Sequence, residues 1–398
     1  MDKVMIVGAG AVQTPLISRA KKLGFDTVVA SIDGPYPGLS LADEVAWVDL
    51  RDAEAVAEAA AQLGVVAIVG CGNDMSLPAQ AAACRRTGLP GLSDKAALAS
   101  VNKAVMKEAF FAAGVSCASS MLLRSELDLE QSIEKFGFPF VIKAVDLTGS
   151  AGVSVVRNRE EAREAFELSM SLTNESFCMA EEFLEGENFG AEALVQNGKV
   201  LFVLADGSII HEGRTRIPVG HYMPYDRDAA ELDAITEEVK KAIAACDCDN
   251  CAVNFDLIWR DGKPYVVELS ARAGSTCLPE LQGQYFGVDF YEILVMVALG
   301  RDVSAFFDDS THTWQPVAAS MITASESGVL EAIDVPSPLP DYVRDLTFYA
   351  ECGDEVHAFE RCRDRLGQLV VTGENVEESL QRLRECLDDI SISVSAVD

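Results

Sequence analysis

Basic residues are scarce in this chain, and the scarcity limits what it can bind. Lysines and arginines number 32 against 63 aspartates and glutamates, which gives a formal net charge of −31 at pH 7. A field of that sign repels phosphate backbones and anionic lipid, so we expect neither nucleic acid nor a membrane surface as a partner. A nucleotide site in this chain must therefore carry its own local positive charge or recruit divalent cations.

Long apolar runs are also missing. No stretch reaches the roughly 18 apolar residues that a membrane-spanning helix needs, and Met1-Asp2-Lys3-Val4 begins an expected strand rather than the apolar core of a signal peptide. We therefore expect a cytoplasmic protein with reduced thiols. Cys246, Cys248 and Cys251 lie close enough to suggest zinc, but no nearby fourth ligand follows. Small buried cysteines near a helix end are the preferred interpretation.

The order of apolar segments predicts a mixed architecture. Short apolar strands at Lys3–Val7, Thr27–Ile32 and Val65–Val69 alternate with helical stretches, which is typical of a parallel, doubly wound sheet. From Ala191 onward the pattern is antiparallel, because the turns Asn197-Gly198 and Asp261-Gly262 each separate two strand-like runs. A chain of 398 residues is expected to divide into two to four lobes.

The second hairpin carries two acidic residues. Asp256 and Glu268 flank the Asp261-Gly262 turn, and facing strands can place both carboxylates on one face. Two carboxylates there repel each other unless a cation lies between them, and hard oxygen ligands suit magnesium that carries nucleotide phosphates. Arg272 lies four residues after Glu268 and could reach the same centre. The alternative is an ordinary solvated hairpin face.

Two further segments have features of a nucleotide site. Lys143 ends an apolar strand, where its ammonium needs an anion, and the small residues at 148–152 follow it. Small residues let backbone N–H groups approach phosphate oxygens. The strand end at Glu181–Leu184 could pair its backbone with an adenine edge. The alternatives are a lysine that extends from a strand end to solvent, and an ordinary strand exit.

Taken in order, these features resemble the ATP-grasp superfamily of carboxylate–amine ligases over nearly the whole chain. The resemblance is carried by the segments Asn102-Lys103 with Lys107, Phe140–Lys143, Thr148–Gly152, Glu181–Gly186, and Asp256 with Glu268–Arg272. It implies the ATP-grasp architecture, with a doubly wound parallel-sheet lobe, a small lid lobe and a larger antiparallel-sheet lobe. We expect a Rossmann-like pre-ATP-grasp domain over 1–94, an ATP-grasp domain over 95–310 with its lid at about 117–180, and a C-terminal α+β domain over 311–398.

The resemblance also implies roles for individual residues, with ATP and magnesium (or manganese) as cofactors. Arg272 would stabilise the acyl phosphate and the tetrahedral intermediate. Ser270 stands where the metal motif usually has asparagine, which puts a second magnesium ion in doubt. The metal ligands would be Asp256, Glu268 and Ser270. The nucleotide would be bound by Lys103, Lys143, Thr148, Gly149, Ser150, Gly152, Glu181, Glu182, Phe183 and Leu184, with Glu187 or Asn188 at the ribose.

The sequence features that would bind the acceptor substrate are less specific than those of the nucleotide site. Gly220–Pro224, with Arg214 and Arg216 before it, looks like the branch that contains amino-acid (dipeptide) ligases. Arginine and histidine, here His221, can bind a substrate carboxylate in such a loop, although a surface loop with ordinary charges is the alternative. The implied function is ATP-dependent activation of a carboxylate as an acyl phosphate and its joining to an amine, in a possible homodimer.

Two other functions remain open from the sequence. A purine-pathway-like ligase shares the ATP residues and differs in its acceptor pocket. An NAD-dependent oxidoreductase could use Gly8-Ala9-Gly10 and Asp33, but Gln13 replaces the third glycine of the fingerprint. That function would also leave Lys143 and Arg272 without a role.

Overall fold

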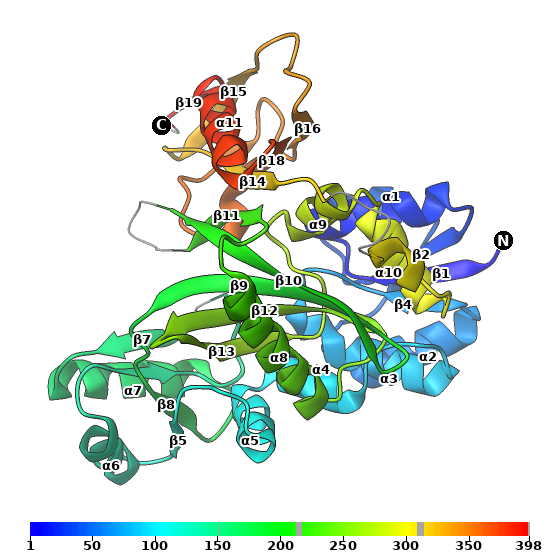
Figure 1. Cartoon of the computed structure of the whole chain (residues 1–398). Helices are drawn as coiled ribbons and strands as arrows, with labels where there is room; N and C mark the ends of the chain where they lie inside the picture. Colours follow the sequence, from blue (N-terminus) through cyan, green and yellow to red (C-terminus); the bar gives the residue numbers. More distant parts are fainter. Residues whose placement is uncertain (150, 212–216, 309–313, 397–398) are drawn as a thin grey trace.

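The computed structural model describes residues 1–149, 151–211, 217–308 and 314–396, and these residues form four β-sheets with helices packed on them (Figure 1). The expected combination of a parallel-sheet lobe with a large antiparallel sheet is confirmed. None of the helices in these ranges is both long and apolar enough to cross a membrane. The expected domain boundaries stay predictions.

The N-terminal lobe is built on a parallel sheet in the order β3-β2-β1-β4. Alternate residues of β1 enter different cores: Val4 and Ile6 pack with helices α1 and α10, whereas Met5 and Val7 pack with α2 and α3. Burial on both faces explains why the strands read as continuous apolar runs. The elements are β1 (Lys3–Val7), α1 (Thr14–Lys22), β2 (Asp26–Ser31), β3 (Glu44–Trp47), α2 (Ala53–Leu63), β4 (Ala67–Val69), α3 (Leu77–Thr87) and, from later in the chain, α10 (Phe290–Ala298).

Two capped helices lead into a small lobe. The Ser93 hydroxyl accepts a hydrogen bond from the Ala96 N–H at the start of α4 (Asp94–Val101), and Asn102 caps α5 (Lys103–Ala113) in the same way. The small lobe is an antiparallel sheet in the order β5-β8-β6-β7 with two helices on it. Its elements are β5 (Ser120–Leu123), α6 (Glu126–Phe136), β6 (Phe140–Lys143), β7 (Val153–Val156), α7 (Arg159–Leu172) and β8 (Cys178–Glu182).

The large sheet has eight strands within the described residues, in the order β13-β12-β9-β10-β11-β14-β18-β16, and all of its pairs are antiparallel. Both expected hairpins are present: Asn197 and Gly198, and Asp261 and Gly262, have positive φ values as their turns require. The strands are β9 (Glu187–Gln196), β10 (Lys199–Ile210), β11 (Pro218–Met223), β12 (Cys251–Arg260), β13 (Lys263–Ser270), β14 (Val317–Thr323), β16 (Val343–Phe348) and β18 (Arg365–Thr372).

Different helices pack against the two faces of this sheet. Odd-numbered residues of β9 and β12, such as Ala193 and Phe255, pack with α8 (Ala229–Ala245), α4 and α5. Even-numbered residues, such as Leu194 and Ala252, face α9 (Leu278–Phe286) and α10. Because side chains alternate along a strand, the acidic residues at even positions of these strands lie on the face away from α8.

The C-terminal segment completes the fold. Strands β14, β16 and β18 extend the large sheet, and α11 (Val376–Asp388) packs on β14 and β18. A separate antiparallel sheet in the order β17-β15-β19 lies at the end of the chain. Its strands are β15 (Gly328–Asp334), β17 (Glu355–Val356) and β19 (Ser391–Ser395). In Figure 1 this segment lies beyond β11, far from the small lobe.

Candidate active site

The carboxylates of Asp256 and Glu268 come from directly opposite positions of β12 and β13, where a β-bulge between Asp256 and Leu257 shifts the register. They therefore share one face of the sheet, as expected. The pKa of Asp256 is raised to about 6, first by burial and then by the charge of Glu268. The Asp256 side chain nevertheless keeps an exposed surface, so an ion from solvent can reach it. Two crowded carboxylates fit a divalent cation, whose charge would relieve their repulsion.

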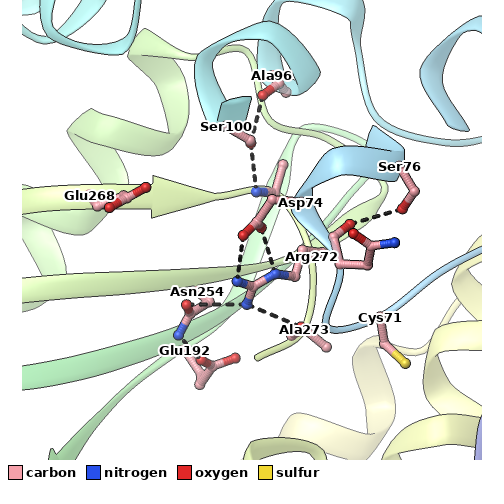
Figure 2. Close-up of polar contacts among 12 residues, drawn as sticks. Cys71, Asp74, Ser76, Ala96, Ser100, Glu192, Asn254, Glu268, Arg272 and Ala273 are labelled. Carbon is pink, nitrogen blue, oxygen red and sulfur yellow. Dashed lines mark hydrogen bonds and ion pairs between the residues drawn. The ribbon is translucent and has the colours of Figure 1, made fainter. Parts of the chain in front are cut away.

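Arg272 lies two residues beyond β13 and is fixed from two sides (Figure 2). Its Nε and Nη2 donate to the two carboxylate oxygens of Asp74 at 2.7 and 3.2 Å, and its Nη1 donates to Asn254 Oδ1 at 3.2 Å. Asp74 belongs to a short 3₁₀ helix, Asp74–Ser76, in the N-terminal lobe. Burial would raise the pKa of Asp74, but the Arg272 guanidinium outweighs it and holds that pKa below its usual value. The N-terminal lobe therefore orients the positively charged Arg272 guanidinium near the Asp256 and Glu268 carboxylates.

Behind Arg272, Asn254 is held by a buried acid. Asn254 lies opposite Ser270 on β13 and opposite Glu192 on β9. Its Nδ2 donates to Glu192 Oε1 at 2.6 Å, and Gln282 Nε2 donates to Glu192 Oε2 at 3.0 Å. Burial, with a contribution from Asp206, raises the pKa of Glu192 to about 8. Glu192 therefore carries a proton near neutral pH.

Three lysines, two on α5 and one at the end of β6, contact acids of β8 and β13. Lys103 Nζ donates to Glu268 Oε1 at 2.8 Å and to the Leu147 carbonyl at 2.7 Å. Lys143 Nζ is 2.8 Å from Glu181 Oε2, and Lys107 Nζ is 3.5 Å from the other oxygen of Glu181. Burial lowers the pKa of Lys143, although Glu181 opposes that shift. The structure thus supplies the local positive charge that an acidic protein needs to bind a nucleotide.

The segment expected to bind adenine and ribose is already partly paired. Glu182 accepts a hydrogen bond from Arg260 at 2.8 Å, and its N–H donates to the Ser119 carbonyl at 2.9 Å. Glu187 is bound by the Tyr225 hydroxyl and by the Arg227 guanidinium. Asn188 is exposed on β9, Phe183 is half-buried and Leu184 is buried.

The other predicted residues divide into those the structure describes and those it does not. In the phosphate-loop segment, Gly149 and Gly152 have φ values of 63° and 68°, which suit glycine, and Thr148 lies beside them. Ser150, Arg214 and Arg216 lie outside the described residues. Of the expected acceptor-side residues only His221 is described, and its Nδ1 is 2.6 Å from Asp206 Oδ2.

The three clustered cysteines show no sign of a metal site. Cys246, Cys248 and Cys251 are buried, and burial raises the pKa of each thiol. Within the described ranges, no group of three or more histidine, cysteine, aspartate and glutamate side chains is placed to hold a metal ion. Asp256 and Glu268 are a pair, which is compatible with magnesium because that ion usually takes its remaining ligands from water and phosphates. All 11 cysteines are free thiols.

Sequence reasoning missed four polar residues of this centre: Asp74, Glu192, Asp206 and Asn254. Asp74 carries no local signal, since it meets Arg272 across 198 residues of chain. Glu192 and Asp206 could have been found, because each is an acid next to an apolar stretch inside an expected strand; both prove fully buried. Acids are almost never fully buried without a partner, so such positions deserve weight.

Comparison with known proteins identifies the family. An ATP-grasp domain model matches residues 99–276, and the model of L-amino acid ligase C-terminal domain 2 matches residues 320–395. The crystal structure of phosphoribosylglycinamide synthetase from Anaerococcus prevotii is 33% identical, with a TM-score of 0.85 and coverage of 99% of this chain and 100% of that one. The chain belongs to the ATP-grasp superfamily.

Other relatives of this ATP-grasp protein include amino-acid ligases. Alanine–anticapsin ligase from Bacillus subtilis (strain 168) is 26% identical over 323 residues, which cover 72% of this chain and 68% of that ligase. The crystal structure of L-amino acid ligase from Bacillus licheniformis shares the fold, with 20% identity, a TM-score of 0.82 and 99% coverage of both chains. The protein is an ATP-dependent carboxylate–amine ligase, close to the amino-acid ligases.

Proposed function

We propose that this ligase uses ATP and magnesium to activate the carboxylate of one amino acid as an acyl phosphate, and then joins it to the amine of a second amino acid. The observation that carries the proposal is the Asp256–Glu268 pair, with Lys103 bonded to Glu268 and Arg272 fixed nearby. The matched C-terminal model of L-amino acid ligases and the similarity to alanine–anticapsin ligase support the choice of amino acids.

Different groups of the described residues would bind the metal, the phosphates, adenine and the ribose. Asp256 and Glu268, with Ser270 beside them, would hold magnesium, which neutralises phosphate charge when bound. Lys103 and Lys143 would bind the phosphates together with the 148–152 loop. Glu181, Glu182, Phe183 and Leu184 would surround adenine. Either Glu187, which Tyr225 and Arg227 already orient, or the exposed Asn188 would contact the ribose.

Arg272 has the position expected of a group that stabilises developing negative charge. Its guanidinium is paired with Asp74 and donates a hydrogen bond to Asn254 Oδ1, so it cannot turn freely. A cation that is already oriented costs no reorganisation when charge appears on the transferring phosphoryl group and then on the tetrahedral oxygen. We assign Arg272 to that role.

A cavity of about 310 Å³ opens at the carboxyl ends of β1, β2 and β4. Its lining helps to choose between the candidate acceptor substrates. The described residues that line the cavity include no lysine or arginine. They are Gly8, Ala9, Gly10, Val12, Gln13, Ser31, Ile32, Tyr36, Asp49, Leu50, Gly72 and Asn73. A phosphorylated acceptor needs a cation or a matching set of donors, so the lining favours an unphosphorylated one. A phosphoribosylamine acceptor is the second candidate, because the 33% identical structure bears the name of such a synthetase.

The same cavity argues against a dinucleotide. Gln13 lies over the glycine turn, and a Cβ on Gly8 would be 3.3 Å from its side chain. Gln13 Nε2 also donates to the Cys71 carbonyl at 2.6 Å, which fixes it there. A pyrophosphate approaches this turn closely only where glycines leave room, so Gln13 blocks that approach.

ADP release from ATP, measured with magnesium and amino acids singly and in pairs, tests the proposal. We expect release above background with a pair of amino acids, and calorimetry should show ATP binding that strengthens with magnesium. Glycine with phosphoribosylamine serves as the competing pair, and NADH as the competing nucleotide. Release with that pair alone would move the protein to the purine-type function, and binding of NADH in place of ATP would overturn the class.

A further inference from the structure

A row of three acidic residues and one glycine crosses the large sheet on one face. Glu268 lies opposite Asp256, Asp256 opposite Gly190, and Gly190 opposite Asp206, on the adjacent strands β13, β12, β9 and β10. Directly opposite residues of antiparallel strands project from the same face. The row therefore extends from the proposed magnesium ligands to Asp206.

The next strand adds His221 to this face. His221 of β11 lies opposite Ser208, two residues along β10 from Asp206, so both side chains leave the same face of the sheet. Its ring Nδ1 is 2.6 Å from Asp206 Oδ2. Both residues are buried, Asp206 completely. A buried histidine bonded to a buried carboxylate has a fixed orientation.

Gly190 makes room for that carboxylate. A Cβ on Gly190 would lie 2.5 Å from Asp206 Oδ1, which is closer than atoms can approach. The glycine therefore allows the Asp206 carboxylate to lie across β9, toward Asp256. Among the described residues no hydrogen-bond partner reaches Asp206 Oδ1, although it is buried. The pair lies close to the proposed magnesium ligands, since only Gly190 of β9 separates Asp206 from Asp256 along the row.

The Asp206 contact decides which ring nitrogen of His221 carries the proton. A carboxylate accepts a hydrogen bond, so Nδ1 donates, and the lone pair of the neutral ring is then on Nε2. A histidine oriented in this way by a carboxylate is an effective proton acceptor. The ligation step needs one, because the amine of a free amino acid is protonated near neutral pH and has no electron pair with which to attack.

We propose that His221, oriented by Asp206, is the general base that removes a proton from the ammonium group of the acceptor. The inference rests on the proposed function and replaces the carboxylate-binding role that the sequence suggested for His221. One proton moves from the ammonium nitrogen to His221 Nε2. The freed electron pair forms the bond from nitrogen to the acyl carbon, the bond from that carbon to the phosphate oxygen breaks with its electrons on phosphate, and the departing phosphate takes the second proton of the nitrogen.

Hydroxylamine distinguishes a role of His221 in deprotonating the acceptor from a role in binding or in forming the acyl phosphate. It is an uncharged nucleophile near neutral pH, so it captures an acyl phosphate as a hydroxamate without needing a base. Wild-type protein is first supplied with ATP, magnesium, hydroxylamine and each of the common L-amino acids or glycine. The amino acid that gives hydroxamate is then offered an amino-acid acceptor, starting with L-alanine, and amide formation is measured beside hydroxamate formation.

We expect His221→Gln to lower amide formation by about a hundredfold, a usual contribution of a general base, and to leave hydroxamate formation within about threefold of wild type. Asp206→Asn should show the same split, because an amide can donate to Nδ1 and so favours the wrong tautomer. His211→Gln is the matched control and should change neither reaction: that histidine packs against Phe359 and lies outside the row.

Each contrary result has a distinct meaning. Equal losses of amide and hydroxamate in His221→Gln would overturn the inference, because His221 would then serve binding or folding. Unchanged amide formation would overturn it as well. A wild-type protein that forms no amino-acid hydroxamate would contradict the proposed function itself, and this inference with it.

Discussion

Asp74 and Arg272 are 198 residues apart in the sequence, yet their side chains form two hydrogen bonds, of 2.7 and 3.2 Å, in a largely buried ion pair. The pair joins the N-terminal lobe to the segment that follows β13, the strand that carries Glu268, one of the magnesium ligands that we propose (Figure 2). It fixes the direction of the guanidinium before any substrate arrives. A charge that is already oriented is the form of stabilisation that contributes most to catalysis in many enzymes.

Arg272→Ala should lower turnover by about a hundredfold or more, comparable to the loss of one oxyanion-hole donor. ATP affinity should hardly change, because in the function that we propose ATP is bound mainly by the lysines, the 148–152 loop and the metal. Steady-state kinetics and an ATP-binding isotherm on the same variant provide the measurement. Near-normal turnover would show that Arg272 only pairs with Asp74.

Arg272→Lys is the conservative comparison. A lysine can keep the charge but cannot donate to both oxygens of Asp74 and to Asn254 at once. We therefore expect partial rescue of turnover at most. Full rescue would show that charge alone matters and that the geometry set by Asp74 does not.

Glu268→Gln should cost far more activity than Ser270→Ala. In the site that we propose, Glu268 would offer a charged oxygen to a divalent cation, and it also binds Lys103. The Ser270 hydroxyl would be a weaker ligand. Turnover and the magnesium dependence of ADP release should be measured for both variants. Small and equal losses would contradict the metal assignment.

Glu181→Gln should destabilise the protein more than Lys107→Met. Glu181 is shared by two buried lysines, so its loss leaves two ammonium groups facing each other without a counter-charge. Removal of Lys107 still leaves Lys143 paired with Glu181. We expect a loss of about 3 kcal/mol in the free energy of unfolding for Glu181→Gln and less than half of that for Lys107→Met, both from urea denaturation. The reverse order would contradict this account of the cluster.

Glu192 should make the stability of the protein depend on pH. Its pKa is raised from the usual 4.5 to about 8, chiefly by burial. Between these values the folded protein keeps a proton that the unfolded chain releases, so stability is fully present below about pH 4.5 and falls as pH rises toward 8. Glu192→Gln cannot titrate and should flatten the dependence measured between about pH 5 and pH 8. Equal slopes for variant and wild type would show that Glu192 does not hold a proton in the fold.

The sequence predicted those parts of the site that lie within one local element. The Asp261-Gly262 hairpin predicted two acids on one face, and the structure has them there because a β-bulge between Asp256 and Leu257 moves Glu268, rather than Val267, into the position opposite Asp256. The burial of Lys143 at a strand end followed from the apolar run before it. The acceptor side was predicted less completely, since no local pattern showed that His221 would meet Asp206.

The sequence by itself determined many of the elements, their turns and the order of the segments that we propose to bind the nucleotide, because alternation, turn residues and caps act over a few neighbouring positions. Only the tertiary structure decided which distant groups meet. It brings Asp74 of the N-terminal lobe to Arg272, and it aligns Glu268, Asp256, Gly190 and Asp206 across four strands. Such contacts depend on strand order and lobe packing, and burial then sets the charge states of the acids by removing them from water.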